Sequence, residues 1–171
     1  MIDGQRYDEA KKMCNNVNNN ISANVHFCKT GYVYLDAILN VVYEKAIEND
    51  IDFSVDCKDN LSFVAGDDLA VLIGNLADNA VEALAKEQNK KLKISIFQNG
   101  SYGVLNVQNY CSSSVLQTNP TLYTSKEDKK NHGKGISIVK SIAKKYGGDV
   151  VISEKNNEFI VSVILDNRIF T

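Results

Sequence analysis

The sequence predicts an α+β domain in which helices pack on one face of a largely antiparallel sheet. Alternating apolar and polar residues come in pairs of short runs, a pattern typical of antiparallel strands. Three segments with apolar residues at helical spacing alternate with these pairs. The chain has 171 residues, which is enough for one ordinary domain or for one domain with a short appendage.

The first part of the chain predicts one helix and a strand pair. Residues 1–30 are polar, rich in asparagine and only weakly periodic. From residue 32 onwards apolar residues recur at helical spacing: Leu35, Ile38, Leu39, Val42 and Ala46. We expect this helix to end near Asn49. Two short alternating runs, 51–55 and 61–64, then predict a pair of strands.

The middle of the chain predicts a second helix and a hairpin. The helix is expected to run from Asp67, a good N-cap residue, to about Lys86. Runs 92–97 and 102–108 then alternate on either side of Asn99-Gly100, a dipeptide typical of tight hairpins.

A long polar segment, residues 110–131, precedes the last helix. It holds the only proline of the chain, and loops of this length in compact domains are usually functional. Gly133-Lys134-Gly135 opens the third predicted helix, and Gly147-Gly148 ends it. A last strand pair, 150–153 and 159–165, is expected around Asn156-Asn157.

The composition excludes several classes of protein. With 44% hydrophobic and 23% charged residues, the chain is neither a disordered tail nor a fibre. Its net charge of -2 gives no basic surplus for nucleic acid, and no apolar run is long enough to span a membrane. The four cysteines form no CxxC pair, so we expect free thiols in a reducing compartment and no zinc site.

The second helix carries a narrow polar ridge. At about 100° per residue, Asn75, Asp78, Asn79 and Glu82 fall in a stripe about 100° wide, between small or apolar residues. A plain solvated helix face is the alternative, but such faces usually carry long side chains over half the circumference, and this helix has no lysine before Lys86. Two amides and two carboxylates on one ridge instead suit a hydrated Mg²⁺ ion and a polar ligand.

Residues 75–83, NLADNAVEA, resemble the N box of the GHKL superfamily, most of all that of the agr-type quorum-sensing kinases. The resemblance implies that Asn79 coordinates Mg²⁺, that Asn75 acts beside it in catalysis, and that Asp78 and Glu82 contribute to ATP binding. ATP-hydrolysing members of the superfamily have a general-base glutamate at the position of Asn75. Because an amide cannot accept a proton near neutral pH, we expect ATP to be held for transfer rather than hydrolysed quickly.

The glycine turn before the third helix resembles the G2 box of the same superfamily. Glycines let the backbone approach phosphate, and the first N–H groups of a helix carry partial positive charge. Gly133 and Gly135 are therefore implied to bind phosphate, with Lys134 between them. Upstream, Ser125 and Lys126 match the lid of the agr-type kinases and are implied to contact the terminal phosphates. The alternative for the lysines is a plain solvated loop.

The first glycine box of the superfamily, DxGxG, is missing. Asn109 stands where the family aspartate accepts a hydrogen bond from the adenine amino group, and an amide oxygen can also accept that bond. Agr-type kinases similarly have asparagine here. The alternative is that Asn109 is only a turn residue.

The resemblance covers about residues 31–166 and implies a Bergerat-type ATP-binding fold. This fold is a two-layer α/β sandwich with a mixed, mostly antiparallel sheet and about three helices on one face. We expect residues 31–171 to form the Mg-ATP-binding catalytic domain. Residues 1–30 are expected to be an N-terminal extension or the remnant of a helical dimerisation segment.

The implied protein is a two-component sensor histidine kinase, a homodimer that serves a response regulator. Neither His26 nor His132 matches an acceptor histidine, so we expect the acceptor on an upstream helix outside this chain. The domain is expected to be cytoplasmic, tied to a membrane only through missing upstream segments. Two alternatives stay open: a stand-alone anti-sigma-type serine kinase of the same fold, and a nucleotide-binding interaction module without transfer activity.

Overall fold

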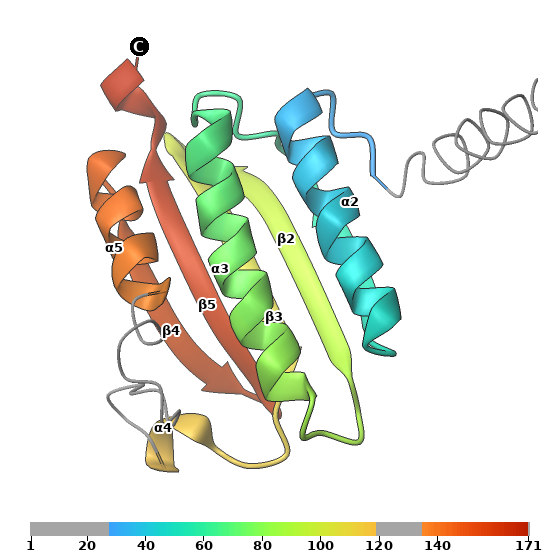
Figure 1. Cartoon of the computed structure of the whole chain (residues 1–171). Coiled ribbons are helices and arrows are strands. Elements are labelled where there is room, and N and C mark those ends of the chain that lie inside the picture. The colour runs from blue at the N-terminus through green and yellow to red at the C-terminus, as the bar shows by residue number, and fades with distance from the viewer. Residues whose placement is uncertain (1–27, 119–134, 171) are drawn as a thin grey trace, which may run out of the picture.

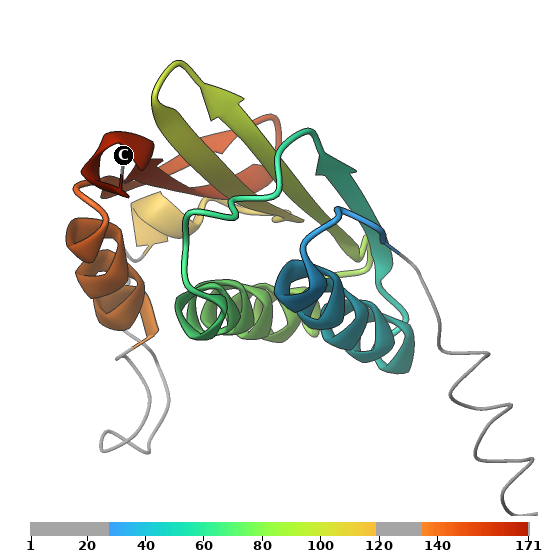
Figure 2. The same cartoon turned by 90° about the horizontal axis from the view of Figure 1, so that it is seen from above.

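A five-stranded mixed sheet covered by helices forms the part of the chain that the computed structural model describes, residues 28–118 and 135–170 (Figure 1). The long helices are α2 (Val33–Glu48), α3 (Gly66–Leu84) and α5 (Gly135–Lys145). Figure 2 shows them, in blue, green and orange, on the same side of the sheet. The strands are β1 (Asp52–Cys57), β2 (Lys91–Asn99), β3 (Tyr102–Tyr110), β4 (Asp149–Lys155) and β5 (Glu158–Asp166). Shorter pieces are α4 (Val115–Thr118) and a 3₁₀ turn, Asn167–Phe170.

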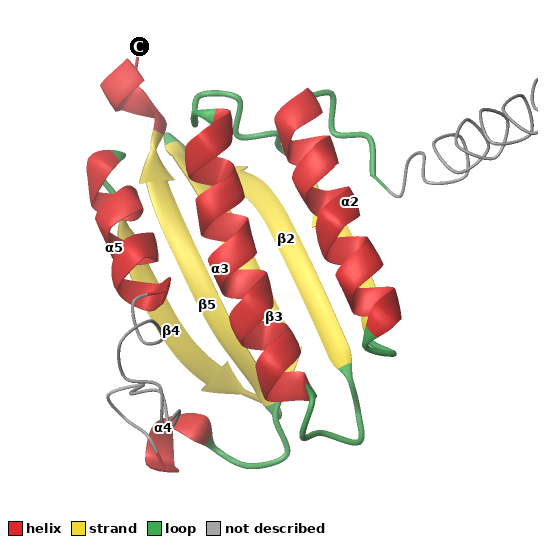
Figure 3. Cartoon of the chain, in the orientation of Figure 1, coloured by secondary structure: helices red, strands yellow, loops and turns green. Residues whose placement is uncertain are grey.

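The strands lie in the order β1-β2-β3-β5-β4, and the yellow arrows labelled β2, β5 and β4 in Figure 3 follow this order. The β2–β3, β3–β5 and β4–β5 pairs are antiparallel, and β1 runs parallel to β2. The expected α+β fold with a mixed, mostly antiparallel sheet and three helices on one face is therefore confirmed.

The strand predicted over residues 61–64 is wrong. Leu61 and Val64 are buried in the core, but they belong to a turn in which the Val64 N–H donates to the Leu61 carbonyl at 2.9 Å. The backbone of Leu61 has a φ of 50°, far from extended geometry, and its N–H is held by the Asp59 carboxylate at 2.7 Å. Two buried apolar residues three positions apart are compatible with a turn as well as with a strand. Because residues 61–64 form no strand, β1 has no antiparallel partner there, and it pairs in parallel with β2.

Both predicted hairpins are confirmed, with one change in detail. Asn99 pairs with Tyr102, so the turn consists of Gly100, with a φ of 60°, and Ser101. Asn156 and Asn157 connect β4 to β5 with φ values of 53° and 63°. Asparagine tolerates this left-handed geometry, which matches the twist of the strands it joins.

The end of α5 follows from its two glycines, and the start of α3 differs from the prediction. The Gly148 N–H donates to Ala143 O and the Gly147 N–H to Lys144 O, with a φ of 61° at Gly147, which is a Schellman cap. Helix α3 begins at Gly66, without a side-chain cap. Asp67 is therefore not the N-cap but lies in the first turn, where its charge still complements the helix dipole.

The core lies between the helices and the sheet face beneath them. Alternate strand residues point to the helices, among them Leu92, Ile94 and Ile96 of β2 and Val161, Val163 and Leu165 of β5. From above, α3 contributes its fully buried Leu69, Leu72 and Ile73. Burying the apolar stripe of each helix on this face leaves the polar ridge of α3 on the outside.

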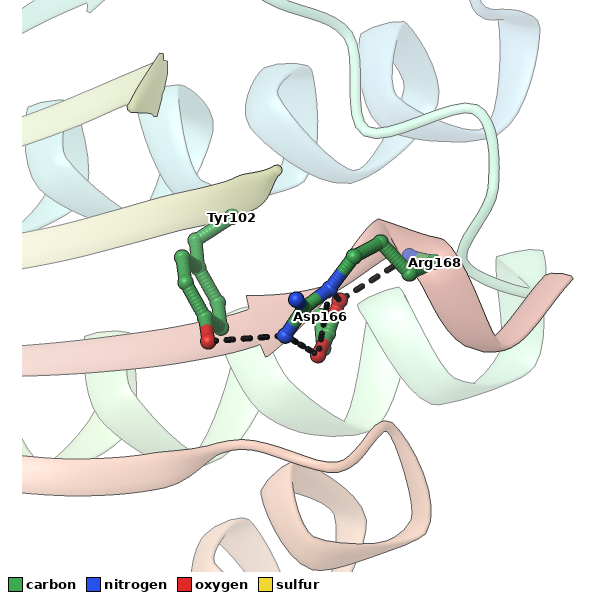
Figure 4. A network of polar contacts seen from close by, with 3 residues as sticks. All are labelled: Tyr102, Asp166 and Arg168. Carbon is green, nitrogen blue, oxygen red and sulfur yellow. Dashed lines mark hydrogen bonds and ion pairs between the residues drawn. The ribbon is translucent and has the colours of Figure 1, made fainter. Parts of the chain in front are cut away.

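A charged network holds the C-terminal end of β5 (Figure 4). Asp166, only 8% exposed, accepts hydrogen bonds from the Arg168 guanidinium at 2.7 and 3.0 Å, and Arg168 also donates to the Tyr102 hydroxyl at 3.0 Å. The neighbouring Asn167 N–H donates to Ser101 O. The end of the chain is thereby tied to the β2–β3 turn.

Among the described residues, no helix is long and apolar enough to cross a membrane. Within the same ranges, Cys28, Cys57 and Cys111 are free thiols, as expected. No group of three or more His, Cys, Asp or Glu side chains in residues 28–118 and 135–170 could hold a metal ion.

Candidate functional site

The polar ridge of α3 meets the start of α5. A Cβ atom added to Gly135 would lie 3.1 Å from Asn75 Oδ1 and 3.6 Å from Asn79 Nδ2. The glycine that opens α5 therefore lies directly against the two amides of the ridge, although 56 residues separate it from Asn79 in the sequence. A Cβ at this position would crowd Asn75 Oδ1, so the Asn75 side chain would have to shift by a few tenths of an ångström.

Asn75 is held in one orientation by its own helix. Its Nδ2 donates to the Val71 carbonyl at 2.7 Å, one turn earlier. This bond uses the donor side of the amide, and Oδ1 is the atom that comes closest to Gly135. Asn79, one turn further along, is exposed. The site therefore offers the Asn75 amide oxygen and the exposed Asn79 amide next to a helix N-terminus. Amide oxygens suit a hydrated cation, and a helix N-terminus suits an anion.

The four polar residues of the ridge do not all face α5, because Asp78 points toward α2. Its carboxylate forms an ion pair with Lys45 of α2, with about half of each side chain exposed. At 100° per residue Asp78 and Asn79 are neighbours in sequence but diverge around the helix. Asn79 faces α5 and Asp78 faces α2, while Glu82 is exposed one turn further on. The structure thus brings Asn75 and Asn79, but not Asp78, to the glycine.

Asn109 occupies the helix-covered face of β3. It is 6% exposed, in line with the buried Leu105 and Val107, which confirms the shared strand face. Its Nδ2 donates to the Tyr110 carbonyl at 3.1 Å. Asn109 lies within the β-ladder, opposite Leu92 on one side and Phe159 on the other, so the turn-residue alternative is wrong.

Four of the expected site residues lie outside the described residues: Ser125, Lys126, Gly133 and Lys134. Their contacts with phosphate stay predictions from the sequence.

Two carboxylates that sequence reasoning missed hold the chain where it leaves β3. Glu154 of β4 accepts hydrogen bonds from Ser114 Oγ at 2.5 Å and from the N–H groups of Val115 and Leu116 at 2.6 and 2.8 Å. The Ser114 bond and these two backbone bonds lower the pKa of Glu154. Glu87, just after α3, accepts from the N–H and hydroxyl of Ser112, both at 3.1 Å. No local signal could have found these contacts, because the partners lie 25 to 40 residues apart.

A second missed cluster joins α3 to α5 at the end away from Gly135. The Tyr146 hydroxyl donates to Asp68 Oδ2 at 2.6 Å and accepts from the Ala65 N–H at 3.0 Å. Lys145 Nζ lies 2.6 Å from the same carboxylate oxygen. Burial raises the pKa of Asp68, but the hydrogen bonds from Lys145 and Tyr146 together lower it below its usual range. This clamp, Asp68–Lys145–Tyr146, fixes the two helices that carry the amides and the glycine relative to each other.

A family model described as "GHKL domain" matches residues 66–166. No curated protein matches the chain significantly.

Several solved structures share the fold. The catalytic domain of the histidine kinase ThkA superposes with a TM-score of 0.64 at 20% identity, covering 78% of this chain and 90% of that one. The Acinetobacter baumannii histidine kinase AdeS gives 0.59 at 15%, covering 78% of this chain and 63% of that one. The mycobacterial sensor histidine kinase MprB gives 0.59 at 16%, with coverages of 78% and 93%. At such identities the structures show the fold alone.

The family match, which spans more than half of the sequence and contains the α3 ridge, the glycine and the clamp, shows that this chain belongs to the GHKL domain family.

Proposed function

We propose that this chain binds Mg-ATP between α3 and the start of α5 and acts as the catalytic domain of a sensor histidine kinase. The observation that carries the proposal is the contact of Gly135 with Asn75 and Asn79. It brings together residues of two motifs, the N box and the G2 box, that are far apart in the sequence.

The residues present suit the proposed ligand. Asn79 is exposed, and its amide oxygen is a ligand of the kind that Mg²⁺ prefers. The start of α5 has N–H groups without partners within the helix, and Gly135 has no Cβ to keep phosphate away from them. Bound Mg-ATP would supply the phosphoryl group that is transferred. Asn75 is an amide and cannot act as a base toward water, which favours holding ATP for transfer over hydrolysis.

Further residues complete the proposed site. Asn109, whose donor side is occupied by Tyr110 O, would accept a hydrogen bond from the adenine amino group through Oδ1. Ser125, Lys126, Gly133 and Lys134 would contact the phosphates. Asp78 stands in an ion pair with Lys45, so we assign it a place at the edge of the site with Glu82 rather than a direct contact.

The wider assignment is also a proposal. The acceptor histidine would lie on upstream dimerisation helices, and a response regulator would receive the phosphoryl group. We keep the agr-type subfamily, the homodimer and the cytoplasmic location as parts of the same proposal. The solved structures of similar fold are named as histidine kinases, which favours this function over a serine kinase or a module without transfer activity.

Isothermal titration with a non-hydrolysable ATP analogue, with and without Mg²⁺, tests the proposal. The unaltered chain should bind the analogue more tightly with Mg²⁺, and Asn79→Ala should abolish that gain. Because Asn79 is exposed, the variant should keep its thermal midpoint. Asn89→Ala, another exposed asparagine outside the site, is the matched control and should behave as the unaltered chain. Unchanged affinity and Mg²⁺ dependence in Asn79→Ala would overturn the metal assignment.

A further inference from the structure

A hollow with several polar side chains lies on the sheet face that points away from α2, α3 and α5. It has a volume of about 480 Å³ and opens between β1, β2 and β3. Its lining combines carboxylates, amides, a hydroxyl, an ammonium group and an aromatic ring: Asp56, Asp59, Gln98, Asn106, Ser95, Lys58 and Phe97. This size lies within the range of small-molecule sites and far exceeds that of a single ion.

One polar group at its floor, the Asn106 side chain, lacks a partner that buried polar groups normally have. Ser95 and Asn106 face each other across β2 and β3, at positions that alternate with core residues. Ser95 is only 9% exposed. The buried Asn106 Oδ1 has no hydrogen-bond partner among residues 28–118 and 135–170. Because nearly all buried side-chain oxygens are hydrogen-bonded, an unpaired acceptor here points to a missing donor.

The rim adds negative charge to these acceptors. Asp56, at the C-terminal end of β1, lies directly beside Ser95 in the β1–β2 register. Lys58 is the only cation of the lining, and its Nζ lies 3.6 Å from Asp56, with most of its side chain exposed. An exposed pair at this distance is weak and easily displaced. With Asp59 also present, the lining carries two carboxylates against one ammonium group.

We propose that this hollow binds a guanidinium group, carried by an arginine side chain of a protein or by a small arginine-like molecule. A guanidinium has five N–H donors in one plane, which can serve the Asp56 carboxylate and the floor acceptors together, and its flat face stacks on aromatic rings such as Phe97. A metal ion fits less well, since no group of three or more His, Cys, Asp or Glu side chains forms in the described parts of the chain. The hollow lies on the other side of the sheet from Asn75 and Gly135, so the proposal is independent of ATP binding.

Three probes in an NMR titration of the whole chain test this chemistry. N-acetyl-argininamide represents an arginine within a polypeptide, agmatine represents a small molecule, and N-acetyl-citrullinamide has nearly the same shape without the charge. We expect saturable shifts of the Ser95 and Asn106 amide signals with an arginine probe and none with the citrulline probe. Binding of the blocked arginine alone assigns the site to a protein partner, and equal binding of agmatine assigns it to small guanidines. The absence of saturable binding, or equal binding of citrulline, overturns the proposal.

Four variants locate the binding. Asp56→Asn should weaken it about tenfold, while Asp52→Asn, at the far end of β1, should leave it unchanged. Lys58→Met should strengthen binding about threefold, because it removes the competing cation. Asn106→Leu should abolish binding while keeping or raising the thermal midpoint, since it replaces an unpaired buried acceptor by an apolar group. A purely structural role for Asn106 would instead lower the midpoint, and equal losses in Asp52→Asn and Asp56→Asn would overturn the assignment.

Discussion

Replacing Tyr146 by phenylalanine removes a single oxygen atom from the contact between α3 and α5. The ring is retained, and its 2% exposure and its packing against Phe63, at a centroid distance of 6.5 Å, should not change. Two hydrogen bonds are lost, one donated to Asp68 at 2.6 Å and one accepted from the Ala65 N–H at 3.0 Å. The variant therefore isolates the polar part of the clamp from its apolar packing.

The expected loss of stability follows from these two bonds. A hydrogen bond to a charged group contributes about 1.5 to 3 kcal/mol. Asp68 keeps its bond to Lys145, and Ala65 is exposed, so water can hydrate its freed N–H. We therefore expect the lower part of that range, about 1.5 to 2 kcal/mol, which corresponds to a decrease of about 5 to 8 °C in the thermal midpoint.

Urea denaturation of the unaltered chain and the variant at pH 7 measures this loss. Tyr102→Phe is the matched control, because the Tyr102 hydroxyl also meets a charged group, Arg168, but the residue is 38% exposed. Its loss should stay below about 0.5 kcal/mol. A loss for Tyr146→Phe no larger than that of the control would refute the argument that the clamp holds the helices together.

The same variant has a predictable pH dependence. The folded-state pKa of Asp68 is lowered, so the stability that this carboxylate contributes is present above its unfolded pKa of about 3.9 and is lost as the pH falls through the folded value. Without the Tyr146 hydroxyl the pKa of Asp68 should rise toward its usual range. The difference in stability between the two proteins should therefore be full at pH 7 and shrink below about pH 4. A difference that stays constant down to pH 3 would contradict this.

Three further substitutions test the fold and the site. Gly148→Ala would place a Cβ 1.7 Å from a backbone carbonyl oxygen of β5, so it should lower the free energy of unfolding, measured by urea denaturation, by about 3 kcal/mol or more. Gly74→Ala is the control: its Cβ would meet nothing within 4 Å, and the free energy of unfolding should rise by about 0.5 to 1 kcal/mol. Gly135→Ala should preserve the thermal midpoint but weaken binding of the ATP analogue about three- to tenfold in titration calorimetry, because the added Cβ crowds Asn75 Oδ1. Unchanged affinity would exclude a close approach of the ligand to the Gly135 backbone. Glu154→Gln should reduce the hydrogen-exchange protection of the two backbone N–H groups that the carboxylate accepts from. Because the pKa of Glu154 is lowered, the unaltered chain should lose this protection only below the usual pKa of glutamate, about 4.3. If the variant keeps the protection of the unaltered chain, the carboxylate charge is not needed.

Much of the candidate site could be predicted from the sequence because its signals are local. The spacing of Asn75 and Asn79 on one helix sets them one turn apart wherever that helix lies. A glycine before an amphipathic helix marks a place where the backbone can be approached, and Gly135 does lie against both amides. By contrast, the ion pair of Asp78 with Lys45 depends on the neighbouring helix α2, and the periodicity of α3 alone does not predict it.

Local chemistry by itself determined the helices, the hairpins and the C-terminal glycine cap of α5 in this protein. Apolar periodicity, a glycine at a tight turn and an asparagine pair with positive φ each act within a few residues, so the sequence reports them directly. Only the tertiary structure decided that β1 pairs in parallel with β2, that residues 61–64 form a turn, and that Tyr146 and Glu154 bind partners distant in the chain. These contacts close long loops, and their free energy comes from burial and charge that exist only once the layers have packed.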